Sequence, residues 1–165
     1  MLPIIVDPRK IVVGLAGSGE ALARRRDHLT EAGVTPVAVA NGCSGALTGL
    51  DILYVAGAAR PAAEALAGHA RALGVLVNVE DVPELCDFHV PATVRRGDLL
   101  LTASSAGRAP GLVRLVREWL SAQFGPDWVE RVAILSRKRA DWRARGLPPS
   151  VVSAKTRSLA EAWFV

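Results

Sequence analysis

Short apolar runs alternate with amphipathic stretches through the first half of the chain. Four runs rich in Val, Ile, Leu or Ala predict strands at 11–15, 35–40, 51–55 and 75–79. Helical patterns lie between them at 20–32 and 61–73, and Gly33 and Gly74 follow these stretches as stop signals. Strands that alternate with helices favour a parallel sheet with crossover helices. The pattern therefore predicts an α/β fold built on a Rossmann-like unit.

The pattern changes after Asp81. Runs at 88–94 and 99–104 predict two strands, and Arg96-Gly97-Asp98 between them is typical of a hairpin turn. The rest is helical in pattern. Asp127 and Glu130 form a capping-box-like start for one helix, and Ser150 is expected to cap a last helix that runs to Trp163. An apolar stripe on the helix opened by Pro110 consists of Leu112, Leu115, Val116, Trp119 and Leu120.

Composition and charge narrow the classes of function. The 165 residues suit about one domain, half of them are hydrophobic, and 22% are charged. The net charge of +4 comes mostly from arginine, whose forked group suits carboxylates and phosphates, although solvated helix faces explain any single cluster at least as well. Aromatic residues do not interleave with the basic ones, so no nucleic-acid partner is predicted.

Cysteine and histidine usage, and the length of the apolar runs, exclude further classes. The two cysteines do not form a C-x-x-C pair and the three histidines are scattered, so neither a disulfide framework nor a permanent metal site is predicted. No apolar run approaches the roughly 18 residues that a membrane span needs. We expect a cytoplasmic protein without a membrane partner.

A glycine loop, Gly17-Ser18-Gly19, separates the first predicted strand from the first helix. In this context, backbone amides at a helix N-terminus can bind a pyrophosphate. The third position of G-x-G-x-x-G is Leu22, however, and the second strand leads to Asn41 rather than to an acid that would hold a ribose hydroxyl. From these residues alone, a nucleotide site and a plain tight turn are equal alternatives.

Two other segments contain candidate catalytic or binding residues. Asp81 follows the strand at 75–79, where a carboxylate that faces a crevice can act as a general base and where a turn-forming aspartate is the alternative. The loop Ser104-Ser105-Ala106-Gly107-Arg108 precedes the helix opened by Pro110. Amides at such a helix start can bind an anion, and a simple helix cap is the alternative for the serines.

Taken in order, these motifs resemble the precorrin-2 dehydrogenase and sirohydrochlorin ferrochelatase family, to which siroheme synthases belong. The matching segments are N-V-x-D at 78–81, F-x-x-P-A-x-V-R-R-G-D-L at 88–99 and S-S-x-G-x-x-P-x-L-x-R-x-x-R-E at 104–118. The resemblance is strong over 77–120, weak at the glycine loop, and only a matter of pattern in the C-terminal helices.

The resemblance implies a three-part protein. A Rossmann-like NAD-binding unit would cover 1–80, dimerisation strands and an active-site segment 81–108, and a small helical domain 109–165. It implies NAD as cofactor, a homodimer, and a tetrapyrrole substrate, precorrin-2, that is oxidised to sirohydrochlorin for siroheme or cobalamin biosynthesis. In bifunctional members of the family ferrous iron is a further substrate, inserted to give siroheme.

The resemblance also implies roles for particular residues, with Asp81 as the catalytic residue. Cofactor-binding residues would be Gly17, Ser18, Gly19, Glu20, Asn41, Ala56 and Gly57. Substrate-binding residues would be Ser104, Ser105, Gly107, Arg108, Arg114, Arg117 and Arg96.

The chain departs from the family pattern at two points. Residues 41–50 replace a strand and helix that family members usually carry, and Ala56-Gly57-Ala58-Ala59 replaces a polar run. These departures keep a second hypothesis open, a non-oxidising tetrapyrrole-binding or chelatase protein with a degenerate NAD site. A generic dinucleotide-binding regulatory domain is a third hypothesis, but it leaves the match over 77–120 unexplained.

Overall fold

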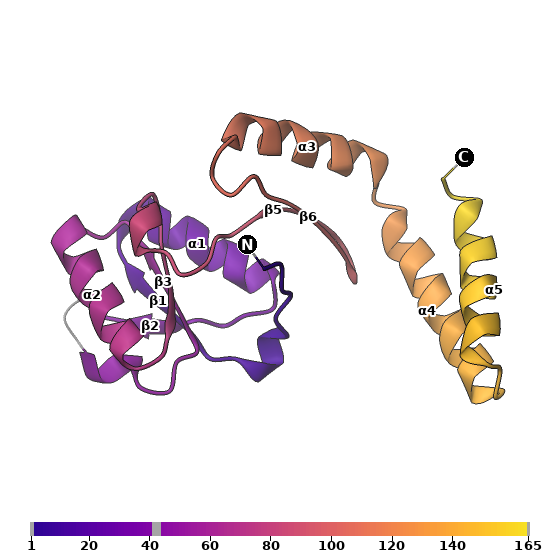
Figure 1. Ribbon diagram of the computed structural model, residues 1–165, viewed down its shortest axis with the longest axis horizontal. Helices are drawn as coiled ribbons and strands as arrows, with labels where there is room; N and C mark the ends of the chain where they lie inside the picture. Colours follow the sequence, from indigo (N-terminus) through magenta and orange to yellow (C-terminus); the bar gives the residue numbers. More distant parts are fainter. Residues whose placement is uncertain (1, 41–43, 165) are drawn as a thin grey trace. The chain divides into compact units, whose positions relative to one another are not determined.

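The computed structural model describes residues 2–40 and 44–164, and the chain divides between Val90 and Pro91 into two units. Each unit is drawn with its own helices and strands in Figure 1. Asn41, one of the predicted cofactor residues, lies outside the described residues.

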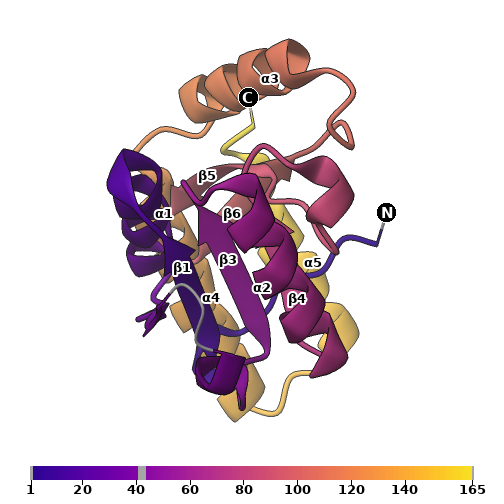
Figure 2. The same cartoon turned by 90° about the vertical axis from the view of Figure 1, so that its left-hand side faces the viewer.

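The first unit is a parallel sheet with helical crossovers. Its elements are β1 (Val13–Gly17), α1 (Gly19–Glu31), β2 (Val37–Val39), β3 (Ile52–Ala56), α2 (Arg60–Ala72) and β4 (Leu76–Val79). Single 3₁₀ turns, which the sequence pattern did not predict, lie at η1 (Pro8–Lys10), η2 (Ser44–Leu47) and η3 (Pro83–Leu85). The strand order is β2-β1-β3-β4 and all neighbours are parallel, which confirms the predicted Rossmann-like α/β fold (Figure 2).

The two helices of this unit cover opposite faces of the sheet (Figure 1). The chain steps from β1 to β2 in one direction and from β3 to β4 in the other, and right-handed crossovers then place the two helices on opposite sides. On the α2 face, Leu53 and Val77 are fully buried against Leu66. On the α1 face, Leu15 packs with Leu29.

The shortened connection between β2 and β3 is part of the core. Leu47 in η2 is completely buried, and Leu50 is nearly so. A Cβ atom on Gly14 of β1 would overlap the side chain of Leu50, so the strand passes directly beneath this connection. In the described part of this connection, Leu47 and Leu50 thus cover the sheet.

The second unit begins with an antiparallel hairpin of β5 (Ala92–Arg96) and β6 (Leu99–Ala103). Gly97 takes the left-handed φ of +57° in the two-residue turn, as a hairpin of this kind requires. The prediction of a strand at 88–94 was wrong in its position. Phe88 belongs to the first unit, where its carbonyl accepts a hydrogen bond from the Asn78 side chain at 2.9 Å.

Three helices complete the second unit: α3 (Pro110–Gln123), α4 (Trp128–Ala144) and α5 (Pro149–Glu161). Figure 1 shows α4 and α5 side by side, and the Trp128 and Trp163 rings, 6.0 Å apart, join the start of one helix to the residues that follow the other. Asp127 is the N-cap residue of α4, as predicted, but its side chain makes no cap and pairs with Arg131 at 2.8 Å instead. The prediction of Ser150 as a cap was wrong, because Ser150 lies inside α5, which begins at Pro149.

Candidate active site

The predicted cofactor residues within the described part of the chain meet where β1 and β3 end. Gly17 pairs with Ala56 across the two parallel strands. The Ser18 amide donates to the Ala56 carbonyl at 3.2 Å, and the Ser18 hydroxyl donates to the Gly57 carbonyl at 3.1 Å. Ligands of open α/β sheets bind at this carboxyl edge, at the point where the strand order reverses, and β1 and β3 flank that point here.

The three glycines at this edge all have positive φ, but the space that a Cβ atom would have differs between them. Gly17 has φ +124°, and a Cβ atom there would overlap the Ala56 carbonyl oxygen; Gly57 has φ +67°, and a Cβ atom there would overlap the Ser18 carbonyl oxygen. Both positions need glycine because the two loops touch. Gly19, at φ +69°, is different, because a Cβ atom there would meet nothing within 4 Å. Its exposed backbone borders open space.

The start of α1 fits a dinucleotide pyrophosphate. Because the Ser18 hydroxyl turns to Gly57, no side chain caps the first amides of the helix, and Gly19 and Glu20 are exposed beside them. Uncapped amides and the helix dipole together favour an anion at such an end. Residues 17–20 would hold the phosphates by their backbone. Ala56 can contribute little, because its side chain is buried and its carbonyl already accepts from Ser18.

Asp81 lies at the same edge, immediately beyond β4, which is the neighbour of β3. It is exposed and has φ +60°, a left-handed conformation that aspartate tolerates better than most residues. The Val82 amide donates to the Val79 carbonyl at 3.3 Å and closes the turn. Among residues 2–40 and 44–164, none bonds to its carboxylate. Asp81 is therefore both a turn residue and a free carboxylate at the ligand-binding edge.

Sequence reasoning missed the role of Glu80, the residue before Asp81. Its carboxylate ion-pairs with Arg24 at 3.1 Å and with Arg25 at 3.9 Å, both on α1. The Arg25 guanidinium also lies 5.3 Å from the centre of the Tyr54 ring, and burial raises the pKa of Tyr54. Strand alternation could have revealed this pairing, because Glu80 shares a face with Tyr54 and α1 covers that face.

The predicted substrate residues all belong to the second unit. The Ser105 hydroxyl accepts from the Ala109 amide at 2.9 Å, and the Ser104 hydroxyl accepts from the Ala106 amide at 3.3 Å. Ala106 and Gly107 are both left-handed, with φ +56° and +75°, so the loop turns sharply before α3. The serines thus bond to amides of the loop before α3. Neither caps the helix, contrary to the alternative interpretation, because Ala109 is the N-cap residue and no side chain bonds to the first amides of α3. Each hydroxyl proton is still able to bind an anion.

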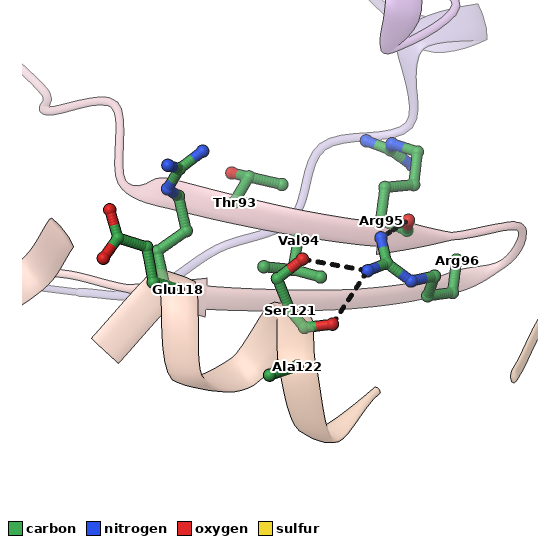
Figure 3. Close-up of a pocket in the computed structure, with 8 residues that line it drawn as sticks. Thr93, Val94, Arg95, Arg96, Glu118, Ser121 and Ala122 are labelled. Carbon is green, nitrogen blue, oxygen red and sulfur yellow. Dashed lines mark hydrogen bonds between the residues drawn. The ribbon is translucent and has the colours of Figure 1, made fainter. Parts of the chain in front are cut away.

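The arginines predicted to bind substrate differ in how they are held. Arg96 donates from Nε to the Phe124 carbonyl at 2.6 Å and from one terminal nitrogen to the Ser121 carbonyl and hydroxyl, as Figure 3 shows for Ser121. The other terminal nitrogen donates to the carbonyl of Arg95. Arg96 therefore caps the end of α3, and the predicted substrate contact would have to compete with this structural role.

Arg114, Arg117 and Arg108 are more accessible. Arg114 is paired with Glu118 at 3.0 Å along the helix surface, where such pairs are weak. Arg117 lines an open hollow of about 520 Å³ that also includes Arg95 and Thr93. Arg108 is exposed in the loop before α3. These side chains are able to reach an anionic ligand without losing a buried contact.

The described ranges contain neither a metal-binding cluster nor a helix suited to a membrane. No group of three His, Cys, Asp or Glu side chains within 2–40 and 44–164 is placed to hold a metal ion. None of the helices in those ranges has both the length and the apolar character that crossing a membrane requires.

Known proteins resemble this chain along most of its length. A family model described as putative NAD(P)-binding matches residues 4–92. The siroheme synthase of Stutzerimonas stutzeri is 32% identical over 149 residues, which cover 75% of this chain and 32% of that protein. The siroheme synthase of Methylococcus capsulatus is 28% identical over 165 residues, covering 87% and 34%. The chain spans about a third of the length of these curated relatives.

A solved structure shares the fold. SirC, described as a precorrin-2 dehydrogenase, superposes with a TM-score of 0.73 at 17% identity, over 99% of this chain and 98% of that one. The family match confirms the coarser cofactor prediction, a nicotinamide dinucleotide. The chain belongs to the putative NAD(P)-binding family, and with it to the precorrin-2 dehydrogenase and siroheme synthase family that its motifs resemble.

Proposed function

We propose that this protein oxidises precorrin-2 to sirohydrochlorin with NAD⁺ as the hydride acceptor. The observation that carries the proposal is one sheet edge with two features, the open backbone at Gly19 and the free carboxylate of Asp81. The siroheme synthase relatives and the fold shared with SirC support a tetrapyrrole as the substrate. Siroheme or cobalamin biosynthesis would use the product.

The reaction removes two hydrogens from the macrocycle, one as a hydride and one as a proton. Bound NAD⁺ supplies a two-electron acceptor for the hydride. A carboxylate oxygen of Asp81 accepts the proton, which requires an ionised side chain that no protein group neutralises. The Ser104-Ser105 loop and the accessible arginines, Arg108 and Arg117, bind the substrate carboxylates. Arginine suits this task because its planar fork can pair with a carboxylate through two hydrogen bonds.

The same proposal includes a homodimer. In the second unit, the large buried hydrophobics are Val94, Trp128 and Val152, which is a small core for three helices and a hairpin. On α3, Leu115 is 64% exposed and Trp119 60% exposed. Apolar side chains at such helical spacing form a face that a second copy of the chain would cover, and each edge of a two-stranded hairpin favours further pairing.

A second candidate function is supported by the residues that follow β3. Ala58 and Ala59 provide no polar side chain for a ribose, and Gly57 touches Ser18 across the site. Such a site favours the hypothesis of a protein that binds sirohydrochlorin, or inserts ferrous iron into it, without oxidising precorrin-2. Ferrous iron would then be a substrate, and Asp81 would accept the pyrrole protons that the metal displaces.

Turnover of precorrin-2 separates the two candidates. Purified protein, precorrin-2 and NAD⁺ should give sirohydrochlorin and NADH in equal amounts, and NADP⁺ should support a slower reaction. Sirohydrochlorin binding without any NADH formation would reject the dehydrogenase and favour the second candidate. A parallel incubation of sirohydrochlorin with ferrous iron, followed by its absorption spectrum, tests iron insertion separately.

A further inference from the structure

Hydrogen bonds hold the segment from Glu80 to Phe88 along the outer edge of β4. Among the described residues, none of these bonds involves the Asp81 side chain. The Asp87 amide donates to the Val77 carbonyl at 2.8 Å, and the Asp87 carboxylate accepts from the Val77 amide at 2.9 Å. The Cys86 thiol donates to the Val79 carbonyl at 3.1 Å. These bonds fix Cys86 and Asp87 against β4. The direction in which the Asp81 side chain points therefore depends on the residues between the end of β4 and Cys86.

Glu80 is the anchor on the other side of Asp81. Its amide donates to the Val55 carbonyl at 2.9 Å, which continues the β3–β4 pairing one residue past the strand. Its carboxylate meets Arg24 at 3.1 Å and Arg25 at 3.9 Å, and the side chains of Glu80 and Arg25 are only 17% and 14% exposed. Solvent weakens the partly buried Glu80–Arg25 pair less than an exposed pair, whereas the shorter contact is to Arg24, whose side chain is 55% exposed. Together the two contacts hold the turn against α1 more firmly than a single surface pair would.

We propose that Glu80 is a positioning residue that holds Asp81 in its left-handed conformation by tying the turn after β4 to α1. The inference rests on the proposed function, because positioning matters to turnover only if Asp81 takes part in the reaction. The claim that Glu80 holds the conformation of Asp81 does not depend on the proposed reaction. Without the Glu80 pair, the φ of +60° at Asp81 is held mainly by the Val82-to-Val79 hydrogen bond. The aspartate would then sample extended conformations that an L-residue adopts more readily.

The test uses Glu80→Gln, with Glu84→Gln as the matched control. Glu84 lies in the same segment and pairs with Arg60 at 2.8 Å, but both side chains are more than half exposed, so its loss should matter little. We expect Glu80→Gln to lower kcat about tenfold with KM for precorrin-2 nearly unchanged, as misplacement of a reacting group does. The Val82 amide should exchange its hydrogen faster than in the control.

A second variant, Arg24→Gln, removes the 3.1 Å contact from its exposed end and covers the case in which Glu80→Gln does not fold. The double variant should be no slower than Glu80→Gln alone, because both changes break one interaction. Equal kcat and equal Val82 exchange in Glu80→Gln and Glu84→Gln would overturn the inference. If the wild-type protein does not oxidise precorrin-2, the proposed function fails, and Val82 exchange alone decides the positioning claim.

Discussion

At the scale of single residues, the backbone of Asp81 is left-handed just beyond β4, in a turn that the hydrogen bond from the Val82 amide to the Val79 carbonyl closes. The sequence predicted an aspartate at this strand end but not its conformation. Gly57 was expected as a cofactor residue, whereas its contact with Ser18 explains the glycine without a ligand. No local pattern reveals such a contact, because the two loops are about 40 positions apart in the chain.

Asp81→Asn should reduce turnover by a factor of about 10² to 10⁴, because the amide keeps the shape and the hydrogen bonding of the side chain but cannot accept the proton. The measurement is NADH formation from precorrin-2 at saturating cofactor. Asp27→Asn, at an exposed position on α1, is the control and should be as active as the wild type. An unchanged rate for Asp81→Asn would remove this carboxylate from the mechanism.

Gly57→Ala should destabilise the protein much more than Gly74→Ala. Both glycines have positive φ, +67° and +77°, so alanine is strained at each by about 1–2 kcal/mol. Only at Gly57 would the new Cβ atom also overlap the Ser18 carbonyl, whereas at Gly74 it meets nothing. Urea unfolding measures the difference. Equal losses in the two variants would show that the β1 and β3 loops do not touch as described.

At the scale of elements, hydrophobic periodicity predicted the four parallel strands and the helices between them to within about two residues. It failed where the partner of a side chain determines the local structure. Phe88 has the apolar character of a strand residue, but the Asn78 side chain and an edge contact with Tyr54 keep it in the first unit. Asp127 has the right spacing for a capping box, yet Arg131 one turn later provides a stronger partner than a backbone amide.

Arg96→Gln should destabilise the second unit by about 1.5–3 kcal/mol, because a charged donor is lost from the carbonyls at the end of α3. Tryptophan fluorescence during urea unfolding reports on this unit through Trp128 and Trp163. The control is Arg95→Gln, since Arg95 is exposed on the neighbouring position of β5. If both variants unfold at the same urea concentration, the cap on α3 contributes nothing.

At the scale of the whole molecule, the first unit has a hydrophobic cluster on each face of its sheet, whereas the second unit has few buried side chains. Leu47, Leu53 and Val77 are completely buried in the first unit, whereas the apolar face of α3 stays open. The sequence predicted an apolar stripe on this helix, but a stripe does not reveal whether the same chain or a second copy covers it. The proposed homodimer would account for both the open face and the small core.

The protein should therefore be a dimer at micromolar concentration, as measured by light scattering. Leu115→Glu should shift it to monomers, because it places a charge on the apolar face of α3. Leu73→Glu is the matched control, an exposed leucine of the first unit whose replacement should leave the dimer intact. A wild-type monomer, or an equal effect of the two changes, would contradict the proposed interface.

Binding of NAD⁺ tests the central claim most directly, because the trimmed first unit must still hold the cofactor. Calorimetric titration should show binding to the wild type at cofactor concentrations up to roughly millimolar. Gly19→Val should abolish it, since the new side chain fills the open space beside the helix start. Its circular dichroism and its affinity for sirohydrochlorin should be retained. A wild-type protein that binds sirohydrochlorin but not NAD⁺ would contradict the account.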